Sequence, residues 1–467
     1  MKVSQTLRVV QAFDRALIAE IPADDARALE GKLVKAAQAL RDRDGWLKPH
    51  QRIALLQRTA GNLELQQDRF VRLIAQEGGK PKKDAAVEVV RAIDGLRNAA
   101  EALRSFAGKE IPMGLTSASE GRWAFTTKEP IGVVAAISAF NHPLNLIVHQ
   151  VAPAIAVGCP VIVKPAPTTP LSCLELVSLL RQAGLDEAWC QTFVTDDNAL
   201  AEALATDTRV AFLSFIGSAR VGWHLRSKLA PGTRCALEHG GAAPVIVDRS
   251  ARLDTIIEPI VKGGYYHAGQ VCVSVQRIFV HTDVAADFVD RFAARVSSLR
   301  VGDPLLEETE VGPLIHPRET VRVASWVDQA VASGARLIGG GRLSETTLVP
   351  AILIEPPSDA KVSQLEVFGP VTCVYKFEDL DRAIDIANSL PFAFQASVFS
   401  TEIGPALRAA QRFDASTVLI NDHTAFRTDW MPFAGRRQAG YGTGGIPWSM
   451  EDMSQEKMIV LRHRINE

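Results

Sequence analysis

The sequence predicts an α/β protein with two doubly wound α/β domains and a small additional β element. The first observation is that short apolar, strand-like segments alternate with helical ones from residue 131 onward. The second is that a further set of such segments starts near residue 244. The third is the length of 467 residues, which exceeds what one hydrophobic core usually organises.

The spacing of apolar residues predicts the individual elements. Helices are expected over residues 26–107, with one long helix ending at the glycine pair before Pro81 and another ending near Gly108. Turn residues between two extended pieces indicate a β-hairpin arm at 111–128. The expected strands are IGVVAAISAF, CPVIVKP, QTFVT and VAFLSFIG in the first set, PVIVD, RIFVHT, ARLIGG, VTCVYKF, QASVFS and STVLIN in the second, and EKMIVLRHRINE at the end.

These elements divide the chain into three parts. The first domain comprises residues 1–110 and 130–239, and the second comprises residues 240–435. Residues 111–129 and 436–467 make up the small β element. An exposed strand edge in this element would need a partner.

The bulk composition narrows the class of protein. The formal net charge of −2 gives no reason to expect nucleic acid or an anionic membrane as a partner. Six cysteines without regular spacing predict neither a disulfide framework nor a metal site. The sequence lacks an 18-residue apolar run and a signal-peptide pattern at its start, so we expect a cytoplasmic protein that has no membrane partner.

Candidate polar residues follow predicted strands of the first domain. Asn141 lies just past a strand end, where its amide suits a developing oxyanion; the alternative is a turn-forming asparagine before Pro143. Lys164 closes a strand and suits a phosphate or a ribose hydroxyl, or is an ordinary lysine at a strand end. Gly217 and Ser218 form a strand-to-helix turn that suits an anion, although the G-x-G-x-x-G pattern is absent.

Three further candidates occur from residue 238 onward. Glu238 precedes a glycine pair that allows close backbone approach, so it is either a general base or a solvated strand-end glutamate. Cys272, in AGQVCVSVQRI, is either a reactive thiol, which often lies at a helix N-terminus, or a buried structural cysteine. The last is Glu366, in EVFGP.

Together and in this order, these segments resemble the aldehyde dehydrogenase superfamily over about residues 20–465. FNHPLN and NDHTAFRTDWMPFAG look like its branch with phosphonoacetaldehyde and lactaldehyde dehydrogenases. The resemblance implies that the first domain binds NAD(P), that the second is catalytic and that the small β element is for oligomerisation. It also implies a homodimer or homotetramer.

The resemblance implies a role for each catalytic candidate. Cys272 matches the nucleophile that attacks the aldehyde carbon, and Asn141 matches the amide that holds the oxyanion together with the Cys272 backbone N–H. After hydride passes to the nicotinamide, a thioester is left. Glu238 matches the base that activates the hydrolytic water.

The resemblance also implies a cofactor site. Lys164 matches the lysine that holds the adenosine ribose. Ser218, after Gly217, matches the residue that contacts the cofactor pyrophosphate. Glu366 matches the carboxylate that binds the nicotinamide ribose, and Phe368 packs beside it. Pro167 stands where many members carry a glutamate that disfavours NADP, so NADP is allowed as well as NAD. His239 stands where a leucine is usual, and we expect a packed side chain there.

Four charged or ionisable residues align with the family's substrate tunnel: Arg91, His142, His149 and Arg427. Arginine binds oxyanions well, so these residues predict a short aldehyde with an anionic tail. Val271 stands where the phosphonoacetaldehyde enzymes carry another arginine, which favours a sulfonate or carboxylate over a dianionic phosphonate.

Alternatives to this substrate prediction remain open. Arg91 could instead form a surface pair with Glu88, and Arg427 a loop salt bridge with Asp429. The substrate would then be a neutral aldehyde such as lactaldehyde. An alternative of another class is a non-catalytic structural or binding protein that has kept the fold.

Overall fold

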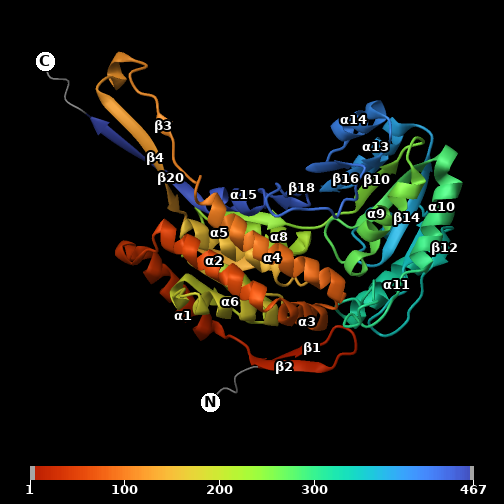
Figure 1. Cartoon of the computed structure of the whole chain (residues 1–467), viewed down its shortest axis with the longest axis horizontal. Coiled ribbons are helices and arrows are strands. Elements are labelled where there is room, and N and C mark those ends of the chain that lie inside the picture. Colours follow the sequence, from red (N-terminus) through yellow and green to blue (C-terminus); the bar gives the residue numbers. More distant parts are fainter. Residues whose placement is uncertain (1–5, 463–467) are drawn as a thin grey trace.

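The computed structural model describes residues 6–462 and contains two large sheets, each covered by helices (Figure 1). The first sheet has six strands in the order β19-β9-β8-β5-β6-β7. All its pairs are parallel except β19 with β9. The strands are β5 (Val133–Ile137), β6 (Val161–Lys164), β7 (Cys190–Thr192), β8 (Val210–Ile216), β9 (Arg234–Glu238) and β19 (Gly440–Tyr441).

Alternate residues of β5 enter separate hydrophobic clusters, because successive side chains of a strand point to opposite faces. Val134 and Ala136 pack with one cluster, whereas Val133, Ala135 and Ile137 pack with another. Helices therefore cover both faces, as predicted for a doubly wound sheet. They are α1 (Ala26–Arg41), α2 (Pro49–Leu65), α3 (Gln67–Gly78), α4 (Lys82–Ala102), α5 (Asn145–Val157), α6 (Leu171–Gln182), α7 (Asn198–Thr206), α8 (Ala219–Ser227) and α15 (Ile446–Asp452).

The second sheet has seven strands in the order β12-β13-β14-β11-β10-β16-β17, of which only the β12–β13 pair is antiparallel. The strands are β10 (Ala243–Val247), β11 (Val275–His281), β12 (Arg336–Gly339), β13 (Ala351–Ile354), β14 (Val371–Phe377), β16 (Gln395–Phe399) and β17 (Thr417–Ile420). The helices are α9 (Leu253–Tyr265), α10 (Thr282–Ser297), α11 (Pro317–Ala332), α12 (Lys361–Gln364), α13 (Leu380–Asn388) and α14 (Ile403–Arg412). Two doubly wound α/β domains are thus confirmed.

A three-stranded antiparallel sheet, β20-β4-β3, projects outward from the part of the molecule that contains the first sheet (Figure 1). It consists of β3 (Glu110–Ile111), β4 (Arg122–Pro130) and β20 (Ser454–Arg462). β4 pairs with β20 over nine residues, from Arg122 opposite Arg462 to Pro130 opposite Ser454. The extended pieces expected near 111–128 and in the tail therefore join one element.

Three features differ from the expectation. The long predicted helix is interrupted at Gln66 and forms α2 and α3, and α4 ends at Ala102, before Gly108. A hairpin, β1 (Thr6–Val10) and β2 (Leu17–Pro22), precedes α1 and was not predicted. Its strands are largely exposed and mix charged with apolar residues.

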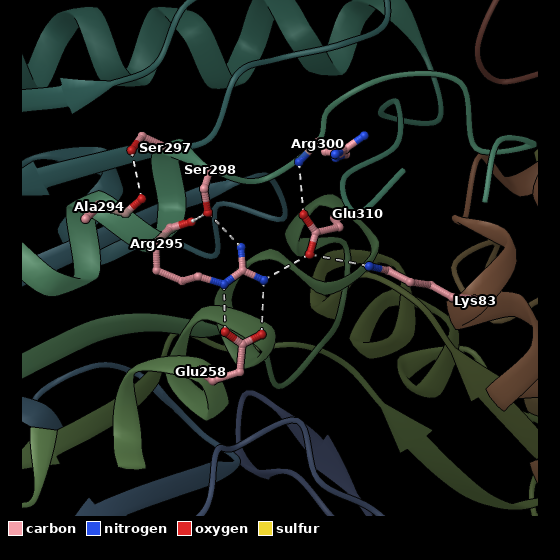
Figure 2. Close-up of polar contacts among 8 residues, drawn as sticks. All are labelled: Lys83, Glu258, Ala294, Arg295, Ser297, Ser298, Arg300 and Glu310. Carbon is pink, nitrogen blue, oxygen red and sulfur yellow. Dashed lines mark hydrogen bonds and ion pairs between the residues drawn. The ribbon is translucent and has the colours of Figure 1, made fainter. Parts of the chain in front are cut away.

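An ion-pair network joins the two domains (Figure 2). The Arg295 guanidinium donates to both oxygens of Glu258, at 2.7 and 3.1 Å, and to Glu310 at 2.9 Å. Lys83 of α4 lies 3.5 Å from the same Glu310 carboxylate. These contacts link the first turn of α4 to the second domain.

No helix within residues 6–462 is long and apolar enough to cross a membrane. The same residues contain no cluster of histidine, cysteine or carboxylate side chains arranged to hold a metal ion.

Candidate active site

A cavity of about 630 Å³ lies between the two domains and is lined by residues from both. Asn141, Glu238, Cys272, Glu366 and Phe368 all contribute to its wall. Arg91, His142 and Arg427 line it as well. The structure therefore brings together in one space most of the residues that the sequence singled out.

Strand topology places part of this wall. β9, β8 and β5 are neighbours in the first sheet and run parallel, so their carboxyl ends share one edge. Asn141 follows β5, Gly217 follows β8, and Glu238 is the last residue of β9. Residues widely separated in the sequence therefore meet at that edge.

Cys272 lies in a turn that leads from a short 3-10 helix, η4 (Tyr266–Gly269), into β11, and not at a helix N-terminus. Three consecutive residues, His267, Ala268 and Gly269, have φ between 48° and 71°. A Cβ atom on Gly269 would lie 2.2 Å from the Gly369 carbonyl oxygen, so only glycine fits there. This left-handed turn presents the thiol to the cavity.

The Asn141 amide is fixed by Gln270, which the sequence pattern had not singled out. Its Nδ2 donates to the Gln270 carbonyl at 2.9 Å, which leaves the second N–H of the amide for a reacting oxygen. Buried Gln270 is itself anchored, because its Nε2 donates to the Pro313 carbonyl and its Oε1 accepts from the Ile315 N–H. These hydrogen bonds join the Asn141 amide to the Cys272 turn in one unit.

Burial favours the neutral forms of both reactive groups. It raises the pKa of the Cys272 thiol well above its usual value, an effect that Glu238 reinforces and Arg427 opposes. Burial also raises the pKa of Glu238, against the opposing influence of Arg427 and Arg91. A carboxyl group with a raised pKa is suited to act as a general base near neutral pH.

The profile of the aldehyde dehydrogenase family matches residues 1–459. The chain belongs to the aldehyde dehydrogenase family. It is an enzyme that oxidises aldehydes with NAD or NADP, so the alternative of a non-catalytic protein is wrong.

Individual relatives resemble the chain over almost its whole length. It is 34% identical over 458 residues to a 3-sulfolactaldehyde dehydrogenase of Priestia aryabhattai, which covers 98% of this chain and 95% of the relative. It is 32% identical over 464 residues to a lactaldehyde dehydrogenase of Methanocaldococcus jannaschii, covering 98% and 97% of the two chains. The structure of aldehyde dehydrogenase 21 of Physcomitrella patens in complex with the reaction product succinate matches with a TM-score of 0.95 at 31% identity, covering 99% and 96%.

Gly217 and Ser218 line this aldehyde dehydrogenase cavity from the first domain, and Glu366 and Phe368 line it from the second. Lys164, the remaining predicted cofactor residue, is not among the residues that line it. Glu366 Oε1 is buried and has no hydrogen-bond partner among residues 6–462, and burial raises the pKa of this carboxyl to about 8. A Cβ atom on Gly240 would lie 1.6 Å from it, so the glycine makes room for the carboxylate. An unpartnered buried acceptor on the cavity wall fits a ribose hydroxyl, and the residues present therefore fit NAD(P).

Phe368, Ser218 and Lys164 complete this predicted set. Phe368 has φ of 47° and packs edge-on against Phe140, with 5.8 Å between ring centroids. Ser218 is the N-cap of α8, and its side chain makes no capping hydrogen bond. Lys164 ends β6 and donates to the Pro165 carbonyl at 3.3 Å, and burial lowers the pKa of its ammonium group to about 8.

His239 is a packed side chain, as expected. Its Nδ1 donates to the Gly217 carbonyl at 2.9 Å, and its ring lies near those of Phe215 and Trp223. A Cβ atom on Gly222 would lie 2.0 Å from the ring, so helix α8 packs directly against this histidine.

Neither arginine makes the structural pair that the sequence offered as an alternative. Arg91 binds Asp429 through two hydrogen bonds, of 2.7 and 3.2 Å, while Glu88 forms a buried pair with Lys80. Arg427 forms no salt bridge within the described part of the chain. Its guanidinium lies 3.6 Å above the centre of the Phe433 ring, and its Nη2 is 3.4 Å from His149 Nδ1.

The two histidines also have partners. His142 Nε2 lies 3.2 Å from the Tyr266 hydroxyl, and His149 Nε2 lies 2.7 Å from Asp429 Oδ1. The sequence had offered Asp429 only as a salt-bridge partner of Arg427, and it had not singled out Tyr266, because a lone acidic or aromatic residue gives no local signal of a distant partner. Only the charge pattern around Arg427 could have suggested a buried carboxylate nearby.

Proposed function

We propose that this NAD(P)-dependent enzyme oxidises a short aldehyde whose tail carries negative charge. The observation that carries the proposal is Arg427, a cation at the cavity wall whose Nε is buried without a hydrogen-bond partner among residues 6–462. A guanidinium group is suited to bind a carboxylate or sulfonate through two parallel N–H donors. Val271, directly before the nucleophile, packs in an apolar cluster and adds no second cation.

The substrates of the relatives support an anionic tail. The Priestia relative is a 3-sulfolactaldehyde dehydrogenase, and the moss structure holds succinate as its reaction product. Sulfonate and carboxylate tails both place oxyanions at the end of a short chain. The second candidate, a neutral aldehyde, is favoured by the lactaldehyde dehydrogenase relative.

The proposed chemistry assigns one task to each catalytic residue. Cys272, whose raised pKa favours the neutral thiol, first loses its proton to solvent. The thiolate then attacks the aldehyde carbon, while the free Asn141 N–H and the Cys272 backbone N–H hold the resulting oxyanion. Bound NAD(P)⁺ supplies the hydride acceptor. Glu238 then removes a proton from water, which attacks the thioester, releases the carboxylic acid and regenerates the thiolate.

A panel of five aldehydes tests the proposed substrate class. Initial rates of NADH and NADPH formation are measured with phosphonoacetaldehyde, sulfoacetaldehyde, succinate semialdehyde, lactaldehyde and propanal. We expect an anionic aldehyde to lead in kcat/KM by more than about tenfold, a difference of roughly 1.4 kcal/mol. A lead by lactaldehyde or propanal would assign the enzyme to neutral aldehydes.

The assembly and location form the last part of this proposal. The β20–β4 element exposes large apolar side chains, namely Trp123, Met458, Val460 and Leu461, beside the free edge of β20. We propose that a second copy of the chain covers this edge in a homodimer or homotetramer, which light scattering would measure. A cytoplasmic location, expected from the cysteine usage, belongs to the same proposal.

A further inference from the structure

A continuous line of polar contacts runs along one wall of the cavity, from α4 through the 421–433 loop to α5. Arg91 binds Asp429, Asp429 binds His149, and His149 contacts Arg427. Asn145 Nδ2 also donates to Asp429, at 3.1 Å. The Asp429 side chain is 4% exposed, so these contacts are made away from bulk water.

The protons in this line can be assigned from its chemistry. A carboxylate only accepts, so His149 Nε2 carries the hydrogen that is donated to Asp429. Neutral His149 then has a lone pair on Nδ1, which accepts from Arg427 Nη2. Burial and repulsion from Arg427 lower the pKa of His149 to about 4, whereas His149 and Arg91 together outweigh burial and hold the pKa of Asp429 well below its usual range.

The charges along this wall do not cancel completely. The two hydrogen bonds from Arg91 to Asp429 make one neutral pair, and Lys80 with Glu88 makes another. Arg427 has no salt-bridge partner in residues 6–462, and Glu238 is the nearby carboxylate with the largest influence on it. Arg427 therefore leaves on this wall one positive charge that no hydrogen-bonded carboxylate within residues 6–462 neutralises.

On the basis of the proposed function, we propose that Asp429 and His149 are positioning residues that do two things. They hold the Arg427 guanidinium in place on the cavity wall, and Asp429 withdraws Arg91 from anion binding. The site then favours a tail with one negative charge, such as a sulfonate or carboxylate, over a phosphonate that carries two.

The number of cations available to the substrate tail is tested with two variants of the Arg91–Asp429 pair. The ratio of kcat/KM for phosphonoacetaldehyde to that for sulfoacetaldehyde is measured at about pH 8, where a phosphonate carries close to two charges. Asp429→Asn frees Arg91 as a second cation, so we expect this ratio to rise at least about tenfold. The double variant Arg91→Gln/Asp429→Asn leaves Arg427 as the single cation and should return the ratio to near that of the wild type.

If Asp429 had only a structural role, Asp429→Asn would change kcat/KM by the same factor for phosphonoacetaldehyde and for sulfoacetaldehyde. If the ratio stays within about twofold of wild type in Asp429→Asn, the proposed withdrawal of Arg91 is wrong. Asp422→Asn, in the same loop, is the matched control, because within residues 6–462 the contacts of the Asp422 carboxylate are to the neighbouring His423, through its backbone N–H and, at 3.9 Å, its ring. Propanal turnover and thermal unfolding report whether each variant is folded.

The positioning of Arg427 is tested separately at His149, which also decides the proposal if Asp429→Asn does not fold. His149→Leu removes both contacts, whereas His149→Asn can keep an acceptor near Nδ1. We expect His149→Leu to raise KM for sulfoacetaldehyde at least about tenfold more than KM for propanal, and His149→Asn to recover part of this loss. Equal changes for both aldehydes in both variants would overturn the proposal.

Different results would contradict the proposed substrate class and the proposed positioning role of Asp429 and His149. If wild-type enzyme prefers propanal or lactaldehyde to every anionic aldehyde, the proposed function itself is wrong. If wild type prefers anionic aldehydes but neither the Asp429 nor the His149 variants change the ratios, only the positioning role fails.

Discussion

Two walls of one cavity are built in opposite ways. The wall with Asn141, Glu238 and Cys272 is formed by the carboxyl ends of parallel strands and by a rigid left-handed turn. A second part of the wall, with Arg91 and Arg427, is formed by a helix and an irregular loop, and its side chains are held by each other. The fold of the backbone therefore positions the proposed catalytic side chains, whereas contacts between side chains determine which charges remain available to a substrate.

The largest expected effect is on the strand-end wall. Cys272→Ser should lower kcat for any aldehyde by at least about a thousandfold, because a serine hydroxyl is a far weaker nucleophile and no base is paired with it. Initial rates of NADH formation measure this. Retention of more than about a tenth of the activity, with unchanged thermal unfolding, would show that another residue is the nucleophile.

Glu238→Gln should have the next largest effect, about a hundred- to ten-thousandfold on turnover, because only the carboxylate can take a proton from water. Acyl-enzyme should accumulate on Cys272 and be visible by mass spectrometry. Since burial raises the pKa of Glu238, wild-type turnover should fall as pH decreases through that raised pKa. The variant should lack this acidic limb, and an identical pH profile would argue against Glu238 as the base.

The two arginines of the charged wall should respond differently to substitution. Arg427→Gln should lower kcat/KM for anionic aldehydes by roughly 2 kcal/mol, about thirtyfold, with propanal much less affected. Arg91→Gln leaves Asp429 buried without its ion pair and should lower the free energy of unfolding by roughly 3 kcal/mol. Chemical denaturation and the substrate panel measure both quantities. If the two variants have the same profile, the distinction between a binding arginine and a structural one fails.

The smallest effect is expected at the network between the domains in Figure 2. Glu310→Gln removes the carboxylate shared by Arg295 and Lys83, in a partly exposed setting. We expect a loss of unfolding free energy below about 1 kcal/mol and no change in aldehyde preference. A large change in preference would mean that the contact between the domains also shapes the tail-binding wall.

The two walls also differ in how far the sequence could predict them. Asn141 could be found because it follows an apolar strand, and Glu238 because it precedes a glycine pair, and both features are visible in the local sequence. The bond from Arg91 to Asp429 joins residues 338 positions apart, so no local pattern indicates it. Gln270 lies two residues before Cys272 in the sequence, but its hydrogen bond with the Asn141 amide depends on the fold of the whole segment.

The same reason applies to the fold. Alternating strands and helices predicted both large sheets, because that pattern repeats over many residues. The β1–β2 hairpin was missed because its strands are largely exposed and mix charged with apolar residues, whereas the equally short β5 and β6 lie in apolar, buried runs. The break between α2 and α3 at Gln66 occurs where the apolar spacing continues through a polar residue with good helix propensity.

The most direct test of the central claim compares two alkylating agents that differ in charge. Iodoacetate and iodoacetamide are similar in size, but only iodoacetate has an anionic tail. Their rates of reaction at Cys272 are measured by mass spectrometry in wild type and in Arg427→Gln. We predict that the iodoacetate-to-iodoacetamide ratio is at least about tenfold higher in wild type, because Arg427 attracts the anion to the thiol. Equal ratios in the two proteins would contradict the claim that this cavity selects an anionic aldehyde.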